Sequence, residues 1–111
     1  MRSILIDEIV PEDMEKLEAW LTEQELGGGI ERLYHFQLPP KLLTPIQQEH
    51  AAECGPFYMA VETGRDGVKL ELLVRAKRIL RCACIAYATA EQEAHMRNYL
   101  ENLLQDLSIP V

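Results

Sequence analysis

The chain has 111 residues, of which 48% are hydrophobic and 26% are charged. These values are typical of a globular domain, and they exclude intrinsic disorder. The length predicts a single domain over residues 1–111, with a core large enough to fold without disulfides or a metal as scaffolding.

The formal net charge is −7, and the basic side chains are concentrated between residues 65 and 81. An acidic molecule repels nucleic acid at long range, so we expect no nucleic-acid partner. No apolar run approaches the roughly 20 residues of a membrane span, and no segment resembles a signal peptide. We therefore expect no membrane association and a cytoplasmic protein whose three cysteines are reduced.

The first predicted elements are a strand over residues 3–9 and an amphipathic helix over residues 11–26. Pro11 suits the first helical position, and Glu12 and Asp13 place carboxylates where the helix dipole favours them. The apolar residues recur at helical spacing and form one stripe: Met14, Leu17, Trp20 and Leu21.

Three glycines, residues 27–29, are predicted to end this helix. Residues 30–38 alternate and predict a second strand, which Pro39 terminates. How the strands at 3–9 and 30–38 join the rest of the sheet is left open by the sequence.

A short helix is predicted over residues 45–53. Thr44, Pro45 and Gln47 form an N-cap, a first-turn proline and a capping-box partner. Its apolar face is small, so we expect tertiary contacts to hold it against the sheet or the sheet edge.

The centre of the predicted fold is an antiparallel meander with strands at 57–63, 68–76 and 81–89. An Asp-Gly step, Asp66–Gly67, separates two alternating runs and predicts a hairpin in which Thr63 pairs with Val68. This register predicts a core face of Phe57, Met59, Val61, Val68, Leu70, Leu72 and Val74. An even connection to the third strand adds Ala83, Ile85 and Tyr87, whereas an odd one reverses that strand.

A second capping box, Thr89 with Gln92, begins an amphipathic helix over residues 90–107. This helix and the helix at 11–26 are predicted to pack on the same face of the meander. The predicted fold class is therefore α+β, a mostly antiparallel sheet with two amphipathic helices on one face and a short third helix.

The other face of the predicted meander is partly apolar and includes Cys82, Cys84, Ala86 and Ala88. Ile79 and Leu80 lie in a basic connection and have no evident place in the core. These features predict an interface formed by Leu73, Arg75, Arg78, Ile79, Leu80, Cys82 and Cys84.

Cys82 and Cys84 are interpreted as small packing residues of the third strand. Side chains two positions apart on a strand lie roughly 6 to 7 Å apart, too far for a disulfide or for two ligands of one zinc ion. Cys54 follows His50 by one helical turn, but the C-terminal end of a helix disfavours a thiolate, so we expect no catalytic role.

His35 and His95 are interpreted as structural histidines. No catalytic, cofactor-binding or metal-binding residue is assigned from the sequence. Whether Cys54, Cys82 and Cys84 bind a metal together with His35 or His50 is left open.

These patterns favour a noncatalytic protein-interaction module whose partner is a second copy of the chain, as a homodimer, or another protein. Two alternatives remain: an acidic protein resembling secretion or assembly chaperones in size and charge, and a small thiol- or metal-dependent enzyme.

Overall fold

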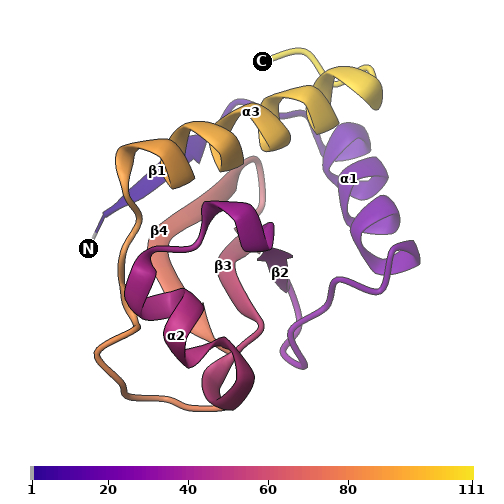
Figure 1. Cartoon of the computed structure of the whole chain (residues 1–111). Helices are drawn as coiled ribbons and strands as arrows, with labels where there is room; N and C mark the ends of the chain where they lie inside the picture. Colours follow the sequence, from indigo (N-terminus) through magenta and orange to yellow (C-terminus); the bar gives the residue numbers. More distant parts are fainter. Residues whose placement is uncertain (1) are drawn as a thin grey trace.

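The computed structural model describes residues 2–111, which form three α-helices and a five-stranded antiparallel sheet of the α+β class (Figure 1). The strand order is β1-β4-β3-β2, and β5 also pairs with β4. In chain order the elements are β1 (Ser3–Ile6), α1 (Pro11–Glu23), β2 (Leu33–Gln37), the 3-10 helix η1 (Pro40–Leu42), α2 (Pro45–Cys54), β3 (Phe57–Thr63), β4 (Val68–Ala76), β5 (Ala86–Tyr87) and α3 (Ala90–Asp106).

The β3–β4 hairpin is confirmed, with Thr63 opposite Val68. Farther from the turn the pairing shifts, because Val61 lies opposite Leu70 while Met59 lies opposite Val74. The shift adds two residues to β4, and an even number preserves the alternation of faces. All seven residues predicted on the core face of these two strands are buried.

The two strands whose position was left open flank this hairpin. β1 pairs with β4, and β2 pairs with β3, both antiparallel. β4 is nine residues long, and its outer edge is shared by two strands. Residues 68–71 of that edge pair with β1, and residues 73–74 pair with β5.

The third strand of the meander is much shorter than the predicted 81–89, since β5 contains Ala86 and Tyr87 alone. β1 already occupies half of the β4 edge, so little of that edge remains for it. Tyr87 lies opposite Leu73 and is half exposed, so its predicted place in the core is wrong. Residues 77–85 form a loop, and within it Cys84 is fully buried.

The first helix ends at Glu23, three residues earlier than predicted, and the glycines do not cap it. Glu25 supplies the left-handed residue after the helix, with φ of 58°. The glycine segment instead runs along the outer edge of β2. Leu26 accepts a hydrogen bond from the backbone N–H of His35, and Gly28 donates one to Leu33, each of 2.8 Å.

All three helices lie on one side of the sheet, as Figure 1 shows. α1 buries Met14, Leu17 and Leu21 in the core. α3 buries Met96, Leu100, Leu103 and Leu104 in the same core, which confirms that the two long helices share a face. Within residues 2–111, no helix is both long and apolar enough to cross a bilayer.

Candidate metal centre and open sheet face

Four side chains that could bind a metal ion converge where α2 meets the 77–85 loop: His50, Cys54, Cys82 and Cys84. Their candidate ligand atoms all lie within 4.8 Å of one another. Nδ1 of His50 is 3.1 Å from Sγ of Cys82 and 4.0 Å from Sγ of Cys54. We call these four residues the Cys3His cluster.

Helix geometry brings the first two residues together. His50 and Cys54 are one turn apart on α2, so their side chains emerge on the same face, as the spacing predicted. Cys54 is the last residue of α2, and its carbonyl accepts a hydrogen bond of 3.1 Å from the backbone of Arg78. This bond fixes the end of the helix against the start of the loop.

The other two residues come from the loop, and here the interpretation from the sequence is wrong. Cys82 and Cys84 are not on a strand: a tight turn, closed by a 3.0 Å hydrogen bond from the N–H of Ile85 to the carbonyl of Cys82, carries them. In a turn, side chains two positions apart can approach each other, whereas extended backbone separates them. The argument that they lie too far apart to share a metal ion therefore fails.

The three thiols differ in acidity. The backbone N–H of Cys84, helped by the Cys84 side chain, lowers the pKa of Cys82 to about 7. Burial raises the pKa of Cys84 to about 12, and burial also raises the pKa of Cys54. Cys82 is consequently the thiol of the cluster that most readily carries a negative charge at neutral pH.

A buried pair of glutamines supports the loop from behind. Both predicted capping boxes are present, and the Gln47 and Gln92 side chains that complete them are buried. Nε2 of Gln92 donates to Oε1 of Gln47 at 3.0 Å, and Nε2 of Gln47 donates to the carbonyl of Cys84 at 3.1 Å. The starts of α2 and α3 are thereby linked directly to the cluster.

The histidines outside the cluster lie elsewhere. His35 stacks on Tyr58, with ring centroids 3.8 Å apart, and its Nδ1 has no hydrogen-bond partner among residues 2–111. Burial, together with the charge of Lys77, lowers the pKa of His35. His95 lines an apolar groove of about 410 Å³ beside Phe36 and Tyr99.

The side of the sheet opposite the helices is uncovered by any helix of residues 2–111 and is called the open face. Strand alternation and register assign to it Ser3, Leu5, Leu33, His35, Gln37, Tyr58, Ala60, Glu62, Lys69, Glu71, Leu73, Arg75 and Tyr87. Two ion pairs lie on it, Lys69–Glu62 at 3.3 Å and Arg75–Glu71 at 2.7 Å.

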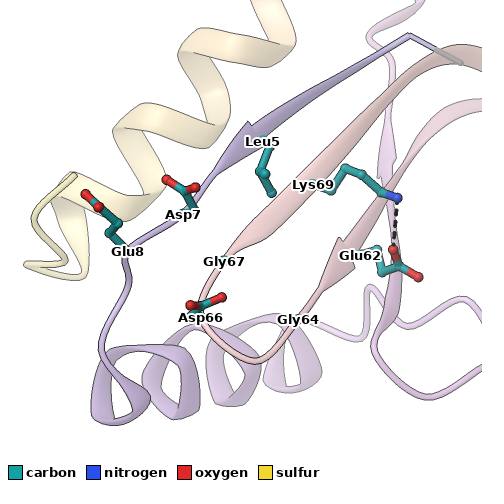
Figure 2. Close-up of a pocket in the computed structure, with 8 residues that line it drawn as sticks. All are labelled: Leu5, Asp7, Glu8, Glu62, Gly64, Asp66, Gly67 and Lys69. Carbon is teal, nitrogen blue, oxygen red and sulfur yellow. Dashed lines mark ion pairs between the residues drawn. The ribbon is translucent and has the colours of Figure 1, made fainter.

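One end of the open face is hollowed beside the β3–β4 turn, forming a depression of about 400 Å³. Figure 2 shows the Lys69–Glu62 ion pair at its rim, with Asp7 and Glu8 beyond the end of β1 and Asp66 in the turn. This end is acidic, whereas the centre of the face carries paired charges.

The predicted interface residues are divided between these two regions. Leu73 and Arg75 lie on the open face. Ile79 and Leu80 are exposed in the loop, and Arg78 donates a hydrogen bond of 2.9 Å to the carbonyl of Ala52. The predicted placement of Cys82 and Cys84 on a sheet face is wrong, since both lie in the 77–85 loop.

The sequence leaves the cluster unassigned because the pattern at 81–89 predicts that Cys82 and Cys84 lie on a strand, where their side chains would be too far apart to bind one metal ion. His50 and Cys54 at i and i+4 present two ligands from one helix face, and a Cys-x-Cys turn presents two more. Either spacing alone is weak, and the combination is the signal that could have identified the site.

Comparison with known proteins gives no relative: no protein-family model, no curated protein and no solved structure matches this chain.

Proposed function

We propose that the protein is a noncatalytic interaction module and that the open face binds a second copy of the chain. The observation that carries this proposal is a sheet with helices on one side and apolar side chains exposed on the other. Leu5 is 61% exposed and Tyr87 is 47% exposed. Leu73 is partly exposed opposite Tyr87, and Leu33 is partly exposed on β2, at the other edge of the same face. Exposed apolar side chains grouped on one face are typical of association surfaces.

Charge favours a second copy as the partner. The chain carries a net charge of −7, so two copies repel each other across most orientations. On the open face, by contrast, Lys69 and Arg75 are each paired with a glutamate of the same face. The paired charges of two open faces therefore cancel away from the acidic end, and the basic side chains of one copy can face the glutamates of the other.

The thiols support a cytoplasmic location. All three cysteines are free, and two of them are buried. A protein with unpaired thiols is suited to a reducing environment, so we place its function in the cytoplasm.

The test is the molar mass in solution, measured by light scattering or sedimentation at increasing protein concentration. We expect twice the chain mass at high concentration. Leu5→Glu places a charge within the proposed contact, at its most exposed apolar side chain, and is expected to shift the protein to the monomer. Ile30→Glu, at a similarly exposed leucine-sized residue outside the open face, is expected to leave the dimer intact.

A wild-type protein that stays monomeric at the highest concentration would contradict the proposal. So would a dimer that persists in Leu5→Glu but dissociates in Leu80→Glu, because Leu80 lies in the loop and is 91% exposed. A different protein that co-purifies stoichiometrically and occupies the face would support the chaperone-like alternative instead.

A further inference from the structure

The structure assigns a zinc site to this chain: we propose that His50, Cys54, Cys82 and Cys84 bind one Zn²⁺ ion in tetrahedral geometry, as a structural centre that joins α2 to the 77–85 loop. The inference is independent of the proposed self-association, because the cluster does not belong to the open face.

The spacing of the ligand atoms fits this ion. A Zn–S distance of about 2.3 Å places two thiolate ligands of one tetrahedron about 3.8 Å apart. The four candidate ligand atoms here lie within 4.8 Å of one another, and His50 Nδ1 lies 3.1 Å from Sγ of Cys82 and 4.0 Å from Sγ of Cys54. The upper limit of 4.8 Å exceeds the ideal sulfur–sulfur spacing by about 1 Å.

The ligand types select the ion. Three thiolates and one imidazole form a soft set that suits Zn²⁺ and excludes Ca²⁺ and Mg²⁺, which prefer oxygen ligands. On binding, each protonated thiol releases its proton and the sulfur lone pair forms the bond to zinc, while His50 binds as the neutral imidazole through Nδ1. Zinc keeps its oxidation state, and no electron is transferred.

Weak apolar packing on both sides of the site provides an independent argument. Of the ten residues of α2, those buried are Gln47 and Cys54. In the 77–85 loop, Cys84 is the buried residue, and residues 77–81 are all exposed. The buried apolar residue of each segment is therefore a cysteine, and a metal ion bound to both cysteines supplies an attachment beyond these contacts and the hydrogen bonds of Gln47.

Hydrogen bonds to backbone carbonyls hold the segments that carry the ligands. The Gln47 amide donates to the carbonyl of Cys84, and Arg78 donates to the carbonyls of Cys54 and Ala52. These hydrogen bonds hold the backbone that carries Cys54 and Cys84, so the positions of these two ligands are fixed before an ion binds. Four protein ligands also fill a tetrahedral zinc ion and leave no position for water or substrate, which makes the centre structural and not catalytic.

The first test is the metal content of the full chain purified without chelators, measured by native mass spectrometry and elemental analysis. We expect one zinc ion per chain. The protein is then stripped of metal under reducing conditions and titrated with Co²⁺. We expect thiolate-to-cobalt charge-transfer absorption and intense visible bands of tetrahedral cobalt, both saturating at one equivalent and both abolished by added Zn²⁺.

Variants identify the ligands. Cys82→Ser and Cys54→Ser are each expected to reduce the charge-transfer intensity by about one third and to weaken Zn²⁺ binding by at least about 100-fold. Cys82 is half-buried, so Cys82→Ser is the variant expected to fold normally. His35→Gln and His95→Gln remove histidines outside the cluster and are expected to retain the full wild-type cobalt spectrum.

The proposal fails if the purified chain holds no zinc and the reduced wild-type protein shows no charge-transfer band with Co²⁺. It also fails if His35→Gln reduces the spectrum as strongly as Cys82→Ser does, because the ligand set would then be a different one. The wild-type titration does not depend on whether any variant folds.

Discussion

At the scale of single residues, Gly67 occupies a position where a neighbouring strand leaves no space for a side chain. The turn between β3 and β4 contains glycines at 64 and 67, and neither has a positive φ; among residues 2–111, Gly29 is the glycine that does. A Cβ atom on Gly67 would lie 2.8 Å from the carbonyl oxygen of Ile6 and 3.2 Å from Cα of Asp7. Glycine is required there by the close approach of β1.

This difference predicts opposite effects for two alanine substitutions in the same turn. Gly67→Ala is expected to reduce the free energy of unfolding by about 1–3 kcal/mol, because the backbone at the end of β1 has to move. Gly64→Ala meets no atom closer than 3.6 Å and is expected to be neutral or to stabilise by up to about 1 kcal/mol. Urea denaturation measures both values. Equal losses would show that the contact with β1 is unimportant.

Individual residues were predictable wherever the pattern was local. The Asp-Gly step fixed the register of the hairpin, and period-two alternation then identified its core face, because burial on one side of a sheet permits only one parity. Gly67 itself was predicted for its turn preference, and its contact with β1 was not foreseeable. That contact joins segments about sixty residues apart.

At the scale of elements, the capping boxes were predictable and their second role was not. Thr-x-x-Gln before a helical pattern has a local meaning, and both helices begin where it indicates. The same two glutamines also meet each other and the Cys84 carbonyl, and these contacts depend on the tertiary fold. The prediction of a strand over residues 81–89 was wrong for a similar reason. β1 competes for the same edge of β4, and residues 81–89 contain no information about that competition.

Removing one of the buried amides tests this second role. Gln47→Ala is expected to lower the free energy of unfolding by about 2–3 kcal/mol, because it leaves the Cys84 carbonyl and a Gln92 donor without their partner. Gln48 is the next residue, and its exposed side-chain amide donates a hydrogen bond to the carbonyl of Leu43. Gln48→Ala is expected to lower the free energy of unfolding by less than about 1 kcal/mol.

The comparison is made by thermal or chemical denaturation of the metal-loaded protein. A loss in Gln47→Ala no larger than that in Gln48→Ala would show that the buried bonds contribute nothing beyond an ordinary capping contact.

At the scale of the whole molecule, the fold contains two regions with different sources of stability. The sheet, α1 and α3 share one apolar core, whereas α2 and the 77–85 loop contribute few buried apolar side chains. The overall α+β class followed from the order of helical and alternating segments. The cluster did not, because it depends on where two weakly patterned segments meet in space.

This division predicts a local response to metal removal. Chelation of zinc from the protein is expected to lower hydrogen-exchange protection in residues 45–54 and 77–85, while the amides of β3, β4 and α3 remain protected. Hydrogen exchange followed by mass spectrometry, with the metal-loaded protein as the reference, measures the change. Uniform loss of protection across the chain would mean that the metal holds the entire fold together, and no change would mean that it holds nothing.

The backbone ladder of the hairpin continues beyond β3 and β4 toward the cysteines. The backbone N–H of Lys77 donates to the carbonyl of Pro56, and that of Arg78 donates to the carbonyl of Cys54. The strand pair at the centre of the sheet therefore holds the end of α2, with Cys54, beside the start of the loop that carries Cys82 and Cys84. Once the hairpin has closed, Cys54 and Cys82 no longer search for each other through a free loop. Their effective concentration is set by the hairpin, and most of the entropy of assembling the site has been lost before any ion arrives. A slip in the hairpin register would separate the ligands, which makes occupancy of the site a direct readout of correct strand pairing.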